Sequence, residues 1–356
     1  MENNAKALVL KGVKILVFLI IIIALLLNIQ GRFVPYNARY SDGSFTFYEI
    51  PENSIDVLIA GTSTTLTGLA PLKLYEDTQI MSYSRCNSYQ APQITYLNVK
   101  EALHYQKPKV VICSVKSLFW TYHSVDEMQP AGIYIGMDYK KLSFDKVKIG
   151  MALAKGSNNY SLSELVFPLV RYHSKWETSF ENIVSEPKEK WDSYRGHDPK
   201  YICMEIVDKS EENMNDTKAV MLSDKSIDWY KKISNLCKKN NIKLLLVEMP
   251  NVNWTMGKHN AVVKVADNLD ANFLDYNYND ILQKCEIKFN EDFLDGGHLN
   301  TRGSIKATDY LGKYIQSKYK LDANRTSGEA KSQFEKDLQV FNKEIEVTEY
   351  EYREDK

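Results

Sequence analysis

The stretch "IDVLIAGTSTTLTGLAP", residues 55–71, decides the fold. Ile55 to Ala60 is a short apolar run that ends in glycine and hydroxyl residues, which predicts a buried strand feeding a tight turn. Ser63 would then stand on a sharp strand-to-helix turn at the carboxyl edge of a sheet, with backbone N–H groups close to its hydroxyl. Glycine and hydroxyl residues are also ordinary turn formers, so this stretch alone does not establish a catalytic serine.

Apolar runs and helical stripes alternate along the rest of the chain. Further strands are expected at 79–84, 107–115, 242–247 and 271–277, and helices at 94–105, 227–237 and 304–319. Continuously apolar strands that alternate with helices predict an α/β fold with a parallel sheet covered on both faces. Residues 120–222 are rich in aromatic and polar residues and lack a strand period. We interpret them as an insertion with helical pieces at the carboxyl edge of the sheet, where ligands bind in open α/β folds.

The N-terminal segment is apolar enough to enter a membrane. Residues 15–31, "ILVFLIIIIALLLNIQG", contain 17 uncharged residues, and a membrane span needs ~17–25. Residues 7–29 therefore make a credible single span. A cleaved signal peptide is the competing interpretation, but the run does not end in small residues of the A-x-A type. Lys6, Lys11 and Lys14 precede the apolar run and favour a cytoplasmic N-terminus, so we expect the remainder outside the membrane.

These features divide the chain into four parts. Residues 1–31 are the cytoplasmic tail and anchor, 32–54 a connector, 55–320 the α/β domain with its insertion, and 321–356 a charged tail. In the tail, apolar residues recur at the spacing of one helix face, which predicts a docking helix; they are Phe334, Leu338, Phe341 and Ile345.

Composition excludes several classes of protein. The 45 basic and 46 acidic side chains nearly balance, which argues against nucleic-acid binding through a broad basic field. The five cysteines are scattered and lack C-x-x-C spacing, so neither a zinc knuckle nor a disulfide framework is expected. No metal-ligand spacing, Walker loop or dinucleotide fingerprint occurs, so the sequence implies no cofactor.

A second stretch, "EDFLDGGHLNTRGS" at 291–304, offers a partner for Ser63. His298 could take a proton from a serine hydroxyl, and Asp295 could fix the tautomer of the imidazole. Gly296 and Gly297 would let the loop turn tightly, and Thr301 or Ser304 could cap the following helix. Alternatively, Asp295 is a helix cap and His298 an ordinary surface residue. The other five histidines lack a comparable partner in the sequence.

Together, the first-strand G-x-S and the late D-x-x-H resemble the SGNH/GDSL hydrolase superfamily. The segments 61–71, 82–112 and 292–311 look like its membrane-anchored bacterial branch, which includes the D-alanine transfer protein of teichoic acid synthesis and polysaccharide O-acetylation proteins. The resemblance implies a flavodoxin-like three-layer core. It also makes Ser63 the nucleophile, His298 the base and then acid, and Asp295 its orienter.

The sequence departs from the superfamily pattern at the oxyanion hole. The second block, "SRCNSYQ", has no glycine, and the third block has Val115, Lys116 and Ser117 where the family has an asparagine. The Ser63 N–H is one expected donor. The candidates for the remaining oxyanion or site-lining positions are Thr64, Cys86, Asn87 and Gln90.

Two charged residues have positions in the sequence that place them near the expected site. Glu248 ends a predicted strand and either lines the site or is a solvated strand-end charge. Arg85 either attracts an anionic glycan or is a plain surface arginine.

The resemblance implies extracytoplasmic transfer of an acetyl or D-alanyl group to or from a cell-envelope polysaccharide or teichoic acid, in a bacterium expected to be Gram-positive. It also suggests a multi-pass membrane O-acyltransferase as partner. Two alternatives remain open: a simple envelope esterase, and a non-catalytic scaffold of an envelope acylation assembly, which the missing glycine and asparagine favour.

Overall fold

The computed structural model describes residues 2–29, 34, 46–138, 140–175, 194–321 and 328–353. Its centre is a five-stranded parallel sheet with the strand order β2-β1-β3-β5-β6. Counted in chain order within this sheet, the strands run 2-1-3-4-5, which is the flavodoxin-like order. The predicted α/β class with a central parallel sheet is confirmed. The strands are β1 (Val57–Gly61), β2 (Ser82–Cys86), β3 (Val110–Ser114), β5 (Lys243–Glu248) and β6 (Asn272–Asp275).

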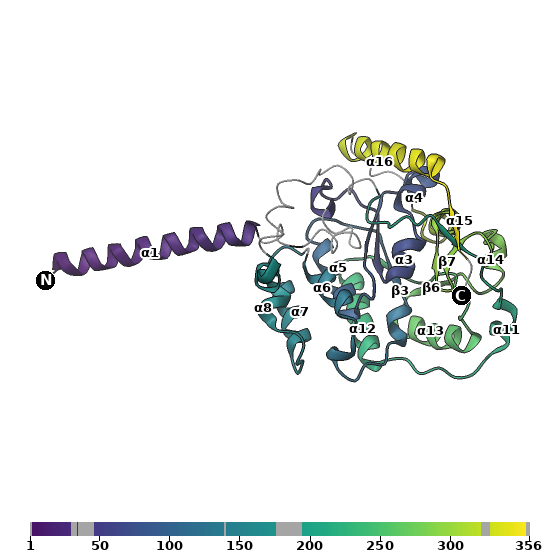
Figure 1. The fold of residues 1–356 in the computed structure, drawn as a ribbon, viewed down its shortest axis with the longest axis horizontal. Helices are drawn as coiled ribbons and strands as arrows, with labels where there is room; N and C mark the ends of the chain where they lie inside the picture. Colours follow the sequence, from purple (N-terminus) through teal and green to yellow (C-terminus); the bar gives the residue numbers. More distant parts are fainter. Residues whose placement is uncertain are drawn as a thin grey trace.

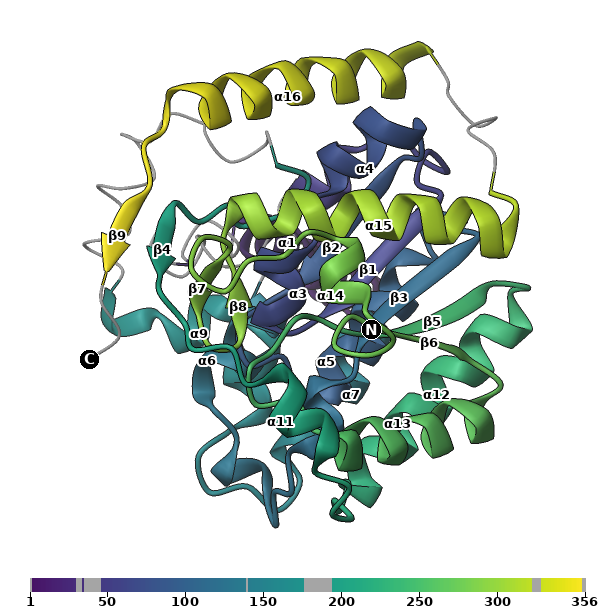
Figure 2. The same cartoon turned by 90° about the vertical axis from the view of Figure 1, so that its right-hand side faces the viewer.

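Two helical layers cover the two faces of the sheet. Val57 and Ile59 point to one core cluster, whereas Leu58 and Ala60 point to the other, as expected for the alternation of side chains along a strand. Figure 2 shows α4 and α15 on one side of the sheet and α12 and α13 on the other. The first face packs against α3 (Ser63–Gly68), α4 (Pro71–Thr78) and α15 (Thr301–Tyr319), and the second against α5 (Pro92–Ala102), α12 (Asp224–Lys239) and α13 (Met256–Leu269).

The segment between β3 and α12 forms a small helical layer beside α5. Ile133, Met137, Ile149 and Leu153 are buried there against Ile94. Residues 139 and 176–193 of the predicted insertion lie outside the described residues. The described elements between β3 and α12 are η3 (Lys116–Phe119), η4 (Val125–Glu127), α6 (Pro130–Asp138), α7 (Phe144–Ala154), α8 (Leu162–Val166), α9 (Pro168–Arg171), η5 (His173–Lys175), β4 (Ile202–Met204) and α11 (Ser210–Asn215).

The N-terminal helix α1 (Glu2–Ile29) extends away from the rest of the chain (Figure 1). Its segment Val9–Leu27 has a mean hydropathy of 2.8 and is not buried. In length and composition this helix could cross a membrane, and a signal sequence would have the same properties. Of the predicted connector, only residue 34 and residues 46–54 are described, the latter including η2 (Thr46–Glu49).

The C-terminal helix α16 (Gly328–Val347) lies along α4 (Figure 2). Two residues of α16, Phe334 and Phe341, are buried, and the rings of Phe334 and Tyr75 are 5.1 Å apart. An ion pair of 2.5 Å between Arg195 and Asp337 adds to this contact. Beyond α16, the short strand β9 (Glu351–Arg353) pairs with β4. The helical spacing of the tail therefore corresponds to a helix that docks on the chain's own α/β domain.

Candidate active site

Ser63 is the first residue of α3, separated by one residue from the end of the interior strand β1. The backbone N–H groups of Thr65 and Leu66 both donate to the Thr62 carbonyl, so the chain turns into the helix within one residue of the strand. Gly61 makes this turn possible, because a Cβ there would lie 2.5 Å from the Cβ of Ser114 at the end of β3. Ser63 itself is only half-buried, so its hydroxyl reaches the carboxyl edge of the sheet.

His298 and Asp295 lie on a two-stranded ribbon formed by β7 (Phe293–Asp295) and β8 (His298–Leu299), where they face each other. His298 Nε2 is 2.8 Å from Ser63 Oγ, and His298 Nδ1 is 2.8 and 2.9 Å from the two carboxylate oxygens of Asp295. An ionised carboxylate only accepts hydrogen bonds, so Nδ1 carries the proton and donates. Nε2 is then free to accept the proton of the Ser63 hydroxyl. The structure thus brings the three predicted side chains into one hydrogen-bonded chain.

The Asp295 carboxylate is stabilised in its charged form. Burial alone would raise its pKa, but the hydrogen bonds from His298 and the 2.8 Å bond from the Gly297 N–H outweigh burial and hold the pKa below its usual value. The side chains of His298 and Asp295 are 27% and 49% exposed. The ribbon is therefore open to solvent while its carboxylate stays ionised at neutral pH.

The ribbon rests on the loop that follows β5. The Val252 N–H donates to the Gly296 carbonyl at 3.0 Å, and a Cβ on Gly296 would lie 2.8 Å from a methyl group of Val252. Neither Gly296 nor Gly297 has a positive φ. The backbone therefore does not need glycine for a tight turn here. Gly296 needs to be small because Val252 lies close to it. Asn251 also adjoins this ribbon, and no pattern in the sequence pointed to either Asn251 or Val252.

The helix that follows the ribbon is capped by Asn300, not by the predicted Thr301 or Ser304. The Asn300 side chain accepts from the Gly303 N–H at 3.2 Å and donates to the Glu291 carbonyl at 2.7 Å. Its amide joins the segment before β7 to the first turn of α15 because it is both donor and acceptor. Thr301 instead exchanges hydrogen bonds with the backbone of Lys200.

The candidate oxyanion positions in the first and second blocks differ in whether they have a free hydrogen-bond donor. Ser63 begins a helix, where the first N–H groups have no acceptor within the helix. The Thr64 hydroxyl lies 3.1 Å from that of Thr62, and the buried Cys86 thiol lies 3.3 Å from the Thr65 hydroxyl. The Ser63 N–H is therefore the best-placed donor of this group.

The two candidate amides have their donors directed elsewhere. Asn87 Nδ2 donates to the carbonyls of Ser88 and Gly132, and its backbone N–H donates to Gly61. Gln90 is fully buried, where its Nε2 donates to Thr95. Neither side chain replaces the missing asparagine in this arrangement, which leaves the backbone of the turn after β2 as the place for a second donor.

That turn contains a strained residue that the sequence did not reveal. Tyr89 has φ +53°, a left-handed conformation that costs a bulky residue roughly 1–3 kcal/mol. Gly132 on α6 packs directly against it, because a Cβ on Gly132 would lie 1.9 Å from the Tyr89 carbonyl oxygen. The inserted helix α6 therefore supports the turn that follows β2.

Glu248 is not a solvated strand-end charge, which was one of the two interpretations of this residue. It is fully buried, with only a 3.4 Å contact from Asn251 Nδ2 to Oε1, and its Oε2 has no partner among the described residues. Burial raises the pKa of this carboxyl to about 7, although the nearby Lys116 ammonium opposes the change. Lys116, from the third block, thus places a cation beside Glu248.

Arg85 is neither a surface arginine nor a group that could attract a glycan. It is fully buried, its guanidinium forms a 2.6 Å ion pair with Glu101, and the same group lies 4.3 Å from the centre of the Phe47 ring. Its role is structural, since it links β2 to α5.

One of the other five histidines, His259, does have an acidic partner, contrary to the expectation from the sequence. His259 Nδ1 lies 2.7 Å from Asp275 Oδ2, and the Trp254 indole donates to the same oxygen. This pair is buried and stacked on Tyr278, so it forms part of the core. Within the described ranges, no group of three His, Cys, Asp or Glu side chains could hold a metal ion, and all five cysteines are buried and free.

No protein-family model matches the chain, and no curated protein matches it in sequence. Among solved structures, a GDSL-like lipase from Bacteroides thetaiotaomicron is similar at 11% identity and a TM-score of 0.31, over 73% of this chain and 87% of its own. A candidate acylhydrolase from Bacteroides fragilis is similar at 12% identity and a TM-score of 0.32, over 76% and 93%. These values are low, so the geometry alone defines the class: an α/β protein with a Ser-His-Asp set.

Proposed function

We propose that this chain is an SGNH-type serine enzyme that breaks or transfers oxygen esters. One observation carries the proposal: the 2.8 Å contact between Ser63 Oγ and His298 Nε2, with Asp295 on the other ring nitrogen. A nucleophile, a base and a group that orients the base, each within hydrogen-bond distance of the next, are what activation of a serine hydroxyl requires.

The chemistry has two steps. Ser63 Oγ attacks the ester carbonyl as its proton passes to His298 Nε2. The alcohol then leaves with that proton, and the acyl group remains on Ser63. In the second step His298 takes a proton from water or from an acceptor hydroxyl, which attacks the acyl-Ser63 carbonyl. Ser63 recovers its proton, and the acid or the new ester departs.

The finer proposal is acyl transfer on an envelope polymer outside the membrane. Helix α1 supports it, since an uncleaved apolar helix would hold the domain beside the envelope. The resemblance in residues 55–119 and 222–318 supports an acetyl or D-alanyl group as cargo and a multi-pass membrane O-acyltransferase as the protein that delivers it. Fractionation of cells that express the full chain tests the anchor, since a cleaved signal would release a shorter protein.

The esterase alternative uses the same residues and differs in the second step. Release of free acid from an acylated glycan, at a rate that an added acceptor does not change, would favour the esterase. Appearance of the acyl group on an added saccharide would favour transfer.

The scaffold alternative is favoured by one observation, which is that the side-chain donors of Asn87 and Gln90 are directed elsewhere. Turnover of p-nitrophenyl acetate by the full chain in detergent tests catalysis against it. We expect turnover that Ser63→Ala and His298→Ala each abolish. A deletion strain fully restored by His298→Ala would decide for the scaffold.

A further inference from the structure

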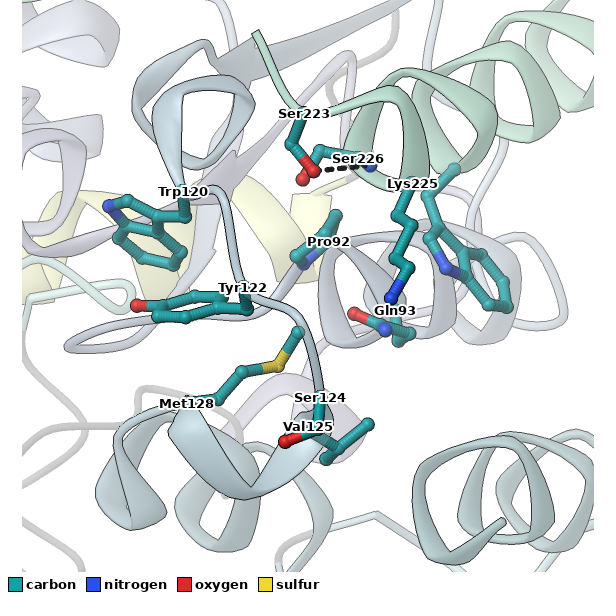
Figure 3. A pocket seen from close by; sticks show the side chains of 11 residues that line it. Pro92, Gln93, Trp120, Tyr122, Ser124, Val125, Met128, Ser223, Lys225 and Ser226 are labelled. Carbon is teal, nitrogen blue, oxygen red and sulfur yellow. Dashed lines mark hydrogen bonds between the residues drawn. The ribbon is translucent and has the colours of Figure 1, made fainter. Parts of the chain in front are cut away.

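A hollow separate from the Ser-His-Asp set opens between the start of α5, the segment that follows β3, and the start of α12. It is a small, partly open hollow with a cavity volume of about 50 Å³, and none of the three triad residues lines it. Figure 3 shows Trp120 and Tyr122 on one wall and Gln93 and Lys225 across from them. The walls are therefore aromatic on one side and polar on the other.

The topology places this hollow at the same edge of the sheet as Ser63. Helix α5 follows β2, and Trp120 follows β3; these two strands flank β1, which ends next to Ser63. Burial and the nearby Tyr89 phenol raise the pKa of Tyr122, so the hollow also adjoins the turn that follows β2. A polymer that reached Ser63 along this edge would pass the hollow.

The aromatic residues offer flat apolar surfaces. The Trp120 and Tyr122 rings are 6.1 Å apart and inclined at 54°. Deeper along α12, Trp229 is held between the Tyr96 ring and the Lys232 ammonium. Aromatic side chains supply a large apolar surface together with a polar group. The C–H faces of a sugar ring pack on such surfaces while its hydroxyl groups point to the side.

Gln93 supplies the second, independent observation. Only 9% of the residue is exposed, and its Oε1 is buried without a hydrogen-bond partner among the described residues. A buried acceptor without a donor costs roughly 1–3 kcal/mol. A ligand hydroxyl would supply the missing donor after a small movement of the amide, whereas an acyl chain has no donor and would leave the acceptor unpaired. The chemistry thus favours a polyhydroxylated ligand over a lipid chain.

Lys225, on the polar wall, is already held in place by a hydrogen bond within the protein. Lys225 Nζ donates to the His123 carbonyl at 2.7 Å and so ties the start of α12 to the segment that carries Tyr122. Ser223 accepts from the Ser226 N–H, which caps α12 at the same place (Figure 3). The hollow is therefore held in shape by contacts that do not involve the ligand.

We propose that this hollow binds one sugar ring of a glycan, with Trp120 and Tyr122 as the stacking surface and Gln93 as a hydrogen-bond acceptor. Its use as the saccharide subsite of an acyl-transfer enzyme rests on the proposed function, whereas the binding itself does not.

Binding is tested on the full-length Ser63→Ala chain, in a detergent without a sugar headgroup. The probes are the tetrasaccharides of β-linked glucose and β-linked N-acetylglucosamine, followed by tryptophan fluorescence and saturation-transfer NMR. We expect one or both to bind, with Trp120→Ala and Gln93→Leu each raising Kd ~10-fold or more, which corresponds to ~1.4 kcal/mol. The matched control is Phe144→Ala, an exposed aromatic residue on α7, which should leave Kd unchanged.

Two results would overturn the proposal: neither tetrasaccharide binds, or binding survives both Trp120→Ala and Gln93→Leu. Binding of decanoate in place of the sugars, lost in Trp120→Ala, would assign the hollow to an acyl chain and also overturn it. Because the Ser63→Ala chain is used, loss of esterase activity and loss of sugar binding are separate outcomes. Serine-probe labelling at the normal rate, measured on Trp120→Ala in a chain that retains Ser63, would show that the triad is intact.

Discussion

Ser63 Oγ and His298 Nε2 lie 2.8 Å apart although 235 positions separate the two residues along the chain. Ser63 is fixed by the end of the interior strand β1, and His298 by a ribbon that rests on the loop after β5. The contact therefore forms only when both halves of the sheet are assembled.

Replacing Asp295 by asparagine should lower kcat/KM for p-nitrophenyl acetate by ~10³–10⁴, because an amide does not hold the imidazole in the tautomer that accepts the Ser63 proton. Steady-state kinetics measures the effect. Asp228→Asn, at a side chain that is 65% exposed on α12, is the matched control. A loss below tenfold in Asp295→Asn would contradict the assigned role.

The inserted helix α6 should affect catalysis through Gly132. In Gly132→Ala the new methyl group meets the Tyr89 carbonyl, so the turn after β2 must move. If that turn carries the second oxyanion donor, the rate should fall by ~10²–10³, which is typical of one lost donor. Gly328→Ala, where a methyl group meets nothing within 4 Å, is the control. An unchanged kcat in a folded Gly132→Ala protein would exclude this turn from the oxyanion hole.

Glu248 should make stability depend on pH. Between its ordinary pKa of 4.5 and its raised pKa of about 7, the folded protein keeps a proton that the unfolded chain has lost. The free energy of unfolding should therefore fall as pH rises through this window, by roughly 3 kcal/mol at most. Glu248→Gln cannot ionise and should lack this decline.

Calorimetry of the full chain at pH 5 and pH 8 measures this effect. The Tm of Glu248→Gln relative to the unmodified protein should be higher at pH 8 than at pH 5, while Glu211→Gln on the exposed face of α11 should show no such change. An equal difference in Tm at both pH values would mean that Glu248 ionises as it does in the unfolded chain.

The buried Arg85–Glu101 ion pair should be essential for stability. Burial alone would raise the pKa of Glu101, but the Arg85 guanidinium lowers it, so both groups are charged in the core. Glu101→Gln leaves the guanidinium buried without its counter-charge and should cost ~3–5 kcal/mol. Denaturant unfolding provides the measurement.

Two further variants complete that experiment. Arg85→Met combined with Glu101→Leu removes both charges and should recover much of the loss. Lys231→Met breaks an exposed pair with Asp228 and should change stability by less than ~1 kcal/mol. A small effect of Glu101→Gln would mean that the pair is not buried in solution.

Much of the sheet could be predicted because its strands are apolar runs of the right length. The run at 55–60 corresponds to β1, and the run at 242–247 to β5. Helix α13 was not predicted. Its buried side chains Val262, Val265, Ala266 and Leu269 do recur at helical spacing, so the missed helix was visible in the sequence.

The candidate site was only partly predictable, because several of its features depend on partners that are distant in the sequence. The spacing of Asp295 and His298 is visible in the sequence, and their positions match a known motif. The burial of Arg85 and Glu248 depends on partners from other elements, such as Glu101 on α5. Likewise, which backbone N–H groups are available to an oxyanion depends on the bonds of Asn87 to Gly61 and Gly132, which no local pattern encodes.

The most direct test of the central claim is the reaction of the full-length protein with a fluorophosphonate, followed by peptide mass spectrometry. A serine activated by His298 should form a covalent adduct on Ser63. The adduct should disappear in Ser63→Ala, form at least ~100-fold more slowly in His298→Ala, and be unaffected by Ser163→Ala on α8. Absence of an adduct, or the same labelling in Ser63→Ala, would contradict the assignment of Ser63 as the nucleophile.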